Sequence, residues 1–151
     1  MTLEELENSL PNGLHDAEVQ SVSVDYEKRT AVIDLEVFVP AVDAAVAERE
    51  AYRSASLIIT GLQFLAIEPP YPNYPFADPG TVRIDACDKT EDLDAEMLKG
   101  LPDESFCRSF FVNEWNAFIH LAGLNAAIEW RAPVVYRKER EHYLPGETID
   151  I

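Results

Sequence analysis

The sequence predicts a mainly β protein, either an antiparallel sandwich or a strongly bent sheet of about seven strands with one or two short helices. Two observations lead to this prediction. Short segments in which apolar and polar residues alternate recur between residues 18 and 130, separated by turn residues. They do not alternate with long helical patterns, which disfavours a parallel α/β sheet. The length of 151 residues fits one domain, residues 1–151, with a β core at 17–130 and a peripheral tail at 131–151.

The amino-terminal residues predict a short amphipathic helix over residues 2–10. Thr2 and Glu5 have the spacing of a capping box, in which both side chains bond free backbone amides of the first turn. The leucines that follow recur at helical spacing, at Leu3, Leu6 and Leu10. The Pro-Asn-Gly sequence at 11–13 ends the helix, because proline cannot continue its hydrogen-bond ladder.

Residues 18–39 predict a β-hairpin. Valines alternate with polar residues up to position 26, and apolar residues alternate with acids again at 33–37. The charged residues 27–29 form the tip between the two strands. Ala17 and Val19 are out of phase with the later valines, which indicates a bulge near Gln20 and Ser21.

The centre of the chain predicts two strands that are buried on both faces. The alanine-rich residues 41–53, which precede these strands, suit either a short helix or a mobile connection, and the helix is the favoured interpretation. Residues 57–60 and 64–67 are β-rich and apolar on both faces, as in central strands. Gly61 lies between them and indicates a bend or a close approach of two backbones.

Loops dominate the next part of the chain. Residues 69–80 are rich in proline and aromatic residues and predict an ordered loop, and the alternation at 81–86 predicts another strand. The acidic residues 88–104 predict a long surface loop. Their spacing and the absence of a central glycine do not match a calcium-binding EF-hand loop, although four carboxylates invite that interpretation: Asp85, Asp88, Asp92 and Asp94.

Residues 106–130 predict three strands. The strands cover 106–112, 117–121 and 126–130, with turns at 113–116 and 123–125.

A helix is the competing interpretation of residues 114–122. Apolar residues also recur there at helical spacing, at Trp115, Phe118, Ile119 and Ala122. The glycine at 123 and the β-rich composition favour the strands.

Charge and composition indicate a cytoplasmic protein that binds neither membranes nor nucleic acid. The acidic amino terminus does not resemble an export signal, and the longest apolar stretch, residues 55–67, is too short to span a bilayer. The net charge is −16, and residues 1–130 hold 24 acids against 8 bases. Such a surface repels phosphates but attracts basic proteins. The simpler interpretation is that the charge serves solubility alone.

No cofactor or metal ion is predicted. The sequence has no phosphate-binding glycine loop, no nucleophile elbow and no paired-histidine zinc motif. The only cysteines, Cys87 and Cys107, lie in strand-like segments without an activating base, which indicates inert thiols.

His15, Asp16 and His120 are the candidate site residues of a ligand- or metal-binding enzyme. Adjacent residues on an extended chain point to opposite faces, which argues against His15 and Asp16 as one catalytic pair. A structural turn is the favoured interpretation, with Asp16 capping backbone amides and His15 bonding a carbonyl. His120 lies in an apolar strand, which favours a hydrogen-bonded core histidine over a ligand.

A second candidate binding segment is Glu114, Trp115 and Asn116. It places a carboxylate and an amide beside a large aromatic ring at a turn, a combination that suits a recognition surface. Burial of Trp115 as a core anchor is the favoured alternative.

A family resemblance covers about the first quarter of the chain. The sequence Leu-Pro-Asn-Gly-Leu-His-Asp-Ala at residues 10–17, followed by the hairpin, resembles the opening of small bacterial proteins that begin roughly Pro-x-Gly-Leu/Phe-His-Asp-Ala. Some proteins similar to these are grouped with the immunity proteins of polymorphic toxin systems. The resemblance implies relatedness and transfers no catalytic residue.

Two functional hypotheses follow. The first is a non-enzymatic acidic module that binds a basic protein, as an immunity protein does, and an acidic patch on one face would support it. The second is a small enzyme or ligand-binding protein using His15, Asp16 and His120, which requires these side chains to meet in a pocket. The oligomeric state does not follow from the sequence, although an edge strand offers a route to a dimer.

Overall fold

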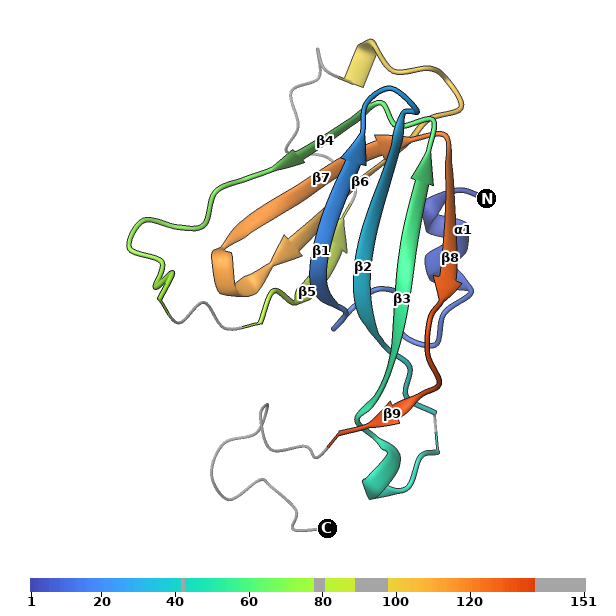
Figure 1. Ribbon diagram of the computed structural model, residues 1–151, viewed down its shortest axis with the longest axis vertical. Coiled ribbons are helices and arrows are strands. Elements are labelled where there is room, and N and C mark those ends of the chain that lie inside the picture. The colour runs from blue at the N-terminus through green and yellow to red at the C-terminus, as the bar shows by residue number, and fades with distance from the viewer. Residues whose placement is uncertain (42, 78–80, 89–97, 138–151) are drawn as a thin grey trace.

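The computed structural model confirms a mainly β protein built of two antiparallel sheets (Figure 1). It describes residues 1–41, 43–77, 81–88 and 98–137, with only the backbone of residues 87 and 88. The strands of sheet A are β1 (Glu18–Asp25), β2 (Thr30–Phe38), β3 (Ala51–Thr60), β8 (Asn125–Trp130) and β9 (Val135–Tyr136). The strands of sheet B are β4 (Phe64–Ile67), β5 (Ile84–Asp88), β6 (Phe106–Val112) and β7 (Ala117–Gly123).

Sheet A is built on the predicted hairpin. Its strand order is β1-β2-β3-β8, with β9 pairing with the start of β3. The register of β1 on β2 shifts between Val19 and Ser21, where the bulge is predicted. Inward-facing residues alternate along β2 and are almost fully buried, at Ala31, Ile33, Leu35 and Val37.

The weakly favoured helix at residues 41–53 is wrong. That segment contains one 3₁₀ turn, η1 (Val46–Glu48), and β3 already begins at Ala51. β2 pairs with all of β3 after its first residue, from Thr30 opposite Thr60 to Phe38 opposite Tyr52. These pairs override the helix propensity of alanine, which is a weak preference in tertiary context.

The two sheets are joined at a corner where the chain crosses from one sheet to the other twice. β3 continues through Gly61 into β4, and β7 continues through Leu124 into β8. The predicted turn at 123–125 is therefore a corner between sheets and not a hairpin. Hydrogen bonds keep the pairing continuous across it, from Leu124 N to Thr60 O (3.0 Å) and from Gln63 N to Ala122 O (2.8 Å).

A second connection joins β1 to the segment that enters β5. Val19 N donates to Val82 O at 2.7 Å, and Ile84 N donates to Ala17 O at 2.9 Å. The fold is thus two bent sheets connected at opposite edges, a combination of the two architectures that the sequence predicts.

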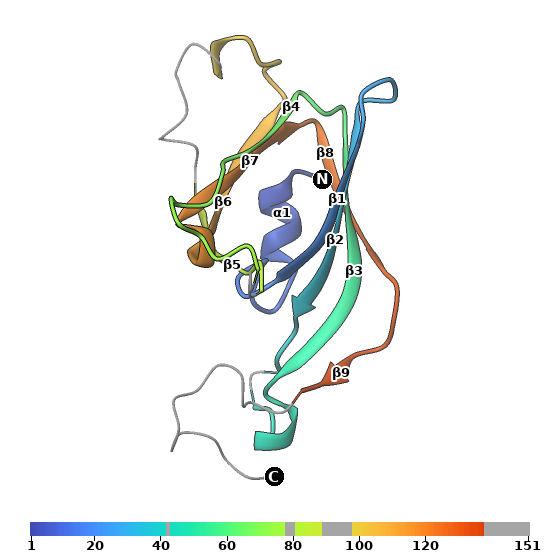
Figure 2. The same cartoon turned by 60° about the vertical axis from the view of Figure 1, so that its left-hand side comes forward.

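Helix α1 (Leu3–Asn8) lies between the two sheets (Figure 2). The predicted capping box is present, since Thr2 and Glu5 bond each other's backbone amides. Leu3 and Leu6 are buried in the core, and Ala126 N of β8 donates to Met1 O at 2.8 Å. No helix in the described part of the chain is long and apolar enough to cross a membrane.

The alternative helix at 114–122 is also wrong. Residues 113–115 form a single 3₁₀ turn, η2 (Asn113–Trp115), and Asn116 then adopts a left-handed conformation before β7 begins. β7 is the central strand that lies between β4 and β6, so backbone pairing on both edges specifies an extended chain. Ile119 and Leu121 face the core, while His120 between them faces outward.

Candidate functional site

His120 is the centre of a hydrogen-bonded cluster on the outer face of sheet B. Its Nδ1 lies 2.6 Å from Ser109 Oγ on β6, and its Nε2 lies 2.7 Å from Glu68 Oε2 at the end of β4. Glu68 Oε1 accepts the backbone amide of Phe118 at 2.9 Å. His120 is buried with both ring nitrogens hydrogen bonded, in agreement with the favoured interpretation of the sequence.

The order of burial in this cluster is the reverse of that in a hydrolase triad. A nucleophilic serine must be reachable by substrate, whereas the supporting carboxylate is usually buried. Here Ser109 is only 4% exposed, and the carboxylate side chain of Glu68 is 44% exposed. The arrangement therefore cross-links three strands of sheet B and does not present a nucleophile.

Glu68 and Ser109 were not identified from the sequence. The signal was present in both cases, because Ser109 is a polar residue on the same strand face as two partly buried neighbours and Glu68 ends an apolar strand. The sequence does not show which strands pair with one another or in which register. Ser109 lies opposite His120 in the register of β6 on β7, and Ala66 lies opposite His120 on β4.

We expect this cluster to make stability depend on pH in the acid range. The hydrogen bond from His120 holds the pKa of Glu68 below its ordinary value of 4.5. A carboxyl whose pKa is lowered on folding stabilises the folded state above the unfolded pKa, and this stability is lost as the pH falls below about 4.5.

Thermal unfolding of the wild type and of Glu68→Gln, measured between pH 7 and pH 3, tests this expectation. The wild type should lose its Tm advantage over the variant as the pH falls below about 4.5. Glu129→Gln, at an exposed position on β8, is the matched control and should follow the wild type. Parallel curves for the wild type and Glu68→Gln would show that the cluster does not titrate in this way.

His15 and Asp16 form an exposed pair, which the sequence argument did not expect. His15 Nδ1 lies 2.8 Å from Asp16 Oδ2. The chain is not extended here, because Asp16 has a φ of 64° and closes the turn that follows α1. The backbone bonds run from His15 N to Asn12 O and from Asp16 N to Ile84 O.

The structure does not bring His15 and His120 together. Among the described residues no hydrogen bond or ring contact links them, since each histidine is bonded within its own turn or cluster. In the same part of the chain, no three His, Cys, Asp or Glu side chains gather closely enough to hold a metal ion. A shared site at these two histidines therefore has no geometric support.

The second candidate segment lies in η2 and at the residue that follows this turn, at one end of sheet B. It consists of Glu114, Trp115 and Asn116. Trp115 packs partly against the core, whereas Asn116 is exposed. Glu114 is half-buried, and its Oε2 is enclosed without a hydrogen-bond partner in the described structure. Trp115 O accepts the amide of Tyr71 at 2.9 Å, so the loop that follows β4 is attached to this turn.

The loop at residues 68–77 presents aromatic side chains. Tyr74 is buried and contacts two neighbouring rings edge-on, Tyr71 at 5.7 Å and Phe76 at 5.0 Å between centroids. These two rings are 41% and 74% exposed, respectively. Exposed large rings in an ordered loop are typical of contact surfaces.

Partly buried aromatic rings continue onto the outer face of sheet B. The rings of Phe111 and Phe118, on paired strands, lie 5.2 Å apart. The Phe118 ring in turn stacks on His120 at 5.5 Å. This face is therefore aromatic and polar, with the carboxylate of Glu68 at its edge.

Charges are distributed unequally between the two sheets. Arginines bind the acids of sheet A, where Arg131 lies 3.2 Å from Asp34 and Arg137 lies 2.9 Å from Glu18. The strands of sheet B contain one basic residue, Arg108, whose guanidinium binds Glu7 of α1 in the interior. The outer face of sheet B in the described residues therefore carries carboxylates without arginine partners.

The arginine cluster on sheet A is structural. Arg137 lies over the ring of Tyr52 at 4.1 Å and donates to both oxygens of Glu18. Burial, the largest effect, raises the pKa of Tyr52 to about 12. Hydrogen bonds from Ser56 and Ser21 lower the pKa of Asp34. These side chains bond one another, so few of their polar atoms remain to bind an external ligand.

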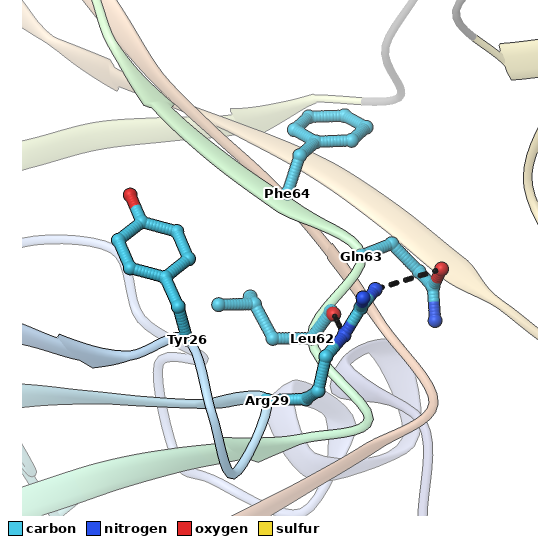
Figure 3. Close-up of a pocket in the computed structure, with 5 residues that line it drawn as sticks. All are labelled: Tyr26, Arg29, Leu62, Gln63 and Phe64. Atoms are coloured by element: carbon cyan, nitrogen blue, oxygen red, sulfur yellow. Dashed lines mark hydrogen bonds between the residues drawn. The ribbon is translucent and has the colours of Figure 1, made fainter.

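A shallow hollow of about 80 Å³ separates the β1–β2 turn from β4 (Figure 3). Arg29 lines it together with Leu62, to whose carbonyl oxygen its Nε donates at 2.8 Å. The exposed ring of Tyr26 stands at the rim. The volume is close to that of a few water molecules and far below that of a typical ligand pocket.

Neither a protein-family model, nor a curated protein, nor a solved structure matches the chain at a significant level.

The structure describes only some of the side chains named in the predictions for the cysteines and the acidic loop. Cys107 is half-buried on β6. The side chains of Cys87 and Asp88, together with Asp92 and Asp94, lie outside the described residues.

Proposed function

We propose that this protein is a non-enzymatic, cytoplasmic binding module that captures a basic protein, as an immunity-type protein captures its toxin. The observation that carries the proposal is the division of its charges. In the described part of the chain, six of the seven arginines contact carboxylates or carbonyl oxygens within the fold, whereas many carboxylates have no partner and face solvent.

The arginine contacts support this division. Arg53 Nε donates to Ala132 O and its guanidinium lies over Trp130, while Arg29 donates to Leu62 O. The arginines at 83, 108, 131 and 137 bind carboxylates within the fold. Their positive charge therefore neutralises nearby acids or satisfies carbonyls and is not displayed as a separate basic surface.

The acids without an internal partner make the surface negatively charged. In the described part of the chain, eight exposed carboxylates form neither an ion pair nor a hydrogen bond: Glu4, Glu27, Asp43, Glu48, Asp85, Asp103, Glu104 and Glu129. Carboxylates that are not engaged internally steer a basic partner at long range and bind it at contact. The net charge of −16 makes this attraction strong at low salt.

Capture by the tagged protein from a lysate of its own host, at about 50 mM and about 500 mM salt, tests the proposal. We expect one basic protein to be retained at low salt and released at high salt. Co-expression should then suppress the activity or toxicity of that protein. Retention of no basic protein at either salt concentration would overturn the proposal, as would a captured protein whose activity is unaffected.

A further inference from the structure

We propose that the surface formed by residues 68–77 and 113–116, here called the loop–turn surface, binds an arginine-rich segment of the partner. This inference rests on the proposed function and assigns its contact site. It commits to one occupant, a basic protein segment in which arginine is preferred to lysine.

Prolines and backbone hydrogen bonds restrict the conformation of the loop before any partner binds. Prolines at 69, 70, 72 and 75 restrict its backbone, since proline fixes φ. Tyr71 N donates to Trp115 O, Tyr74 N donates to Tyr71 O and Phe76 N donates to Tyr74 O, at 2.9, 3.1 and 3.0 Å. A surface that is already ordered loses less conformational entropy on binding, so its contacts convert more fully into affinity.

Two large aromatic rings on this loop are exposed to solvent. The buried ring of Tyr74 makes T-shaped contacts with both Tyr71 and Phe76, and these two rings remain 41% and 74% exposed, so part of each ring is open to a partner. Apolar area left in water has a free-energy cost of about 25 cal/mol per Å². An aromatic face attracts a cation as well as apolar groups, which suits a basic partner.

The charge of the loop–turn surface selects a cation. The sequence contains no lysine or arginine between residues 54 and 82, and none between 109 and 130. Both segments of the surface lie inside these stretches and contribute the carboxylates of Glu68 and Glu114. Glu114 is half-buried and one of its oxygens is enclosed without a partner, so its carboxylate is incompletely hydrogen bonded within the described structure.

The combination of rings and carboxylates favours arginine over lysine. A guanidinium is planar, stacks on an aromatic face and donates to a carboxylate at the same time. An ammonium group is compact and strongly hydrated, so it gains less from a ring. The loop–turn surface offers both types of contact within two segments that Tyr71 and Trp115 connect.

Titration of ¹⁵N-labelled protein with synthetic hexa-arginine and hexa-lysine peptides, at about 50 mM salt, tests the site. Hexa-arginine should bind several-fold more tightly than hexa-lysine, with amide shifts concentrated at residues 68–77 and 113–118. Phe76→Ala should weaken hexa-arginine binding about twofold to fivefold, from the loss of one cation–π contact. Glu114→Gln should weaken it and reduce its salt dependence.

Tyr26→Ala is the matched control, because Tyr26 is an aromatic side chain that is 82% exposed on the β1–β2 turn, away from the loop–turn surface. This variant should bind hexa-arginine as the wild type does. Equal affinity for both peptides with shifts elsewhere, or no loss in Phe76→Ala, would overturn the site and leave the proposed function intact. Absence of binding would also overturn the site, and the capture experiment would decide separately on the function.

Discussion

Replacement of Arg108 by methionine is expected to lower the free energy of unfolding by about 3 to 5 kcal/mol. The guanidinium reaches Glu7 on α1 through two contacts, from Nε at 3.1 Å and from Nη2 at 2.5 Å. The two side chains are 14% and 8% exposed, so little water can replace the lost partner. The variant leaves the carboxylate of Glu7 buried without its cation, which costs far more than the pair contributes over apolar residues.

Urea denaturation of single and double variants separates these contributions. Glu7→Leu combined with Arg108→Met removes both charges and should recover a large part of the lost stability. Lys28→Met is the matched control, since it breaks the exposed pair with Asp25 at the hairpin tip and should have no measurable effect. A double variant that is no more stable than Arg108→Met would contradict this explanation.

The sequence contains enough information for sheet A and for the order of elements. Period-two alternation at residues 30–38 and the phase change before Ser21 identify β2 and the bulge, because each inward side chain must meet the core. The capping box likewise locates the start of α1, because it depends only on residues three apart. Each of these patterns involves residues that are close together in the sequence, so a single sequence is enough to identify it.

The parts that were missed depend on residues distant in sequence. The helix expected at 41–53 follows alanine propensity, but the pairing of β3 with β2 outweighs it. The segment at 123–125 has the composition of a turn, and only the position of β3 beside it makes it a corner. Contacts between segments far apart in the chain are not encoded in the local pattern.

The candidate site was predicted in part for the same reason. Trp115 and its neighbours were identified as a recognition segment because an aromatic ring beside a carboxylate is a local signal. The exposed rings of the adjacent loop join it only through the hydrogen bond from Tyr71 to Trp115. His120 was identified as a hydrogen-bonded residue, yet its partners Ser109 and Glu68 come from other strands.

Replacement of Gly61 by alanine is expected to cost about 3 kcal/mol of stability, from two separate effects. Gly61 has a φ of 60°, a conformation that costs an L residue about 1 to 2 kcal/mol. A Cβ at this position would also lie 2.7 Å from Cγ and Cδ1 of Leu124, across the corner between the sheets. Overpacking of this kind typically costs about 1 to 3 kcal/mol more.

Gly13→Ala isolates the first effect, because Gly13 has a similar φ of 56° but its Cβ would meet neighbours at ordinary distances of 3.7 and 3.8 Å. Denaturation experiments should therefore show a smaller loss in Gly13→Ala than in Gly61→Ala. Removal of the opposing side chain, in Gly61→Ala combined with Leu124→Gly, takes away all three clashing atoms, because Cβ of Leu124 would also lie at 2.8 Å. Measured against Leu124→Gly alone, the glycine substitution should then cost as much as Gly13→Ala. An equal loss in both single variants would mean that the corner yields to the extra methyl group, and that the close approach of the two crossing strands does not constrain the bend between the sheets.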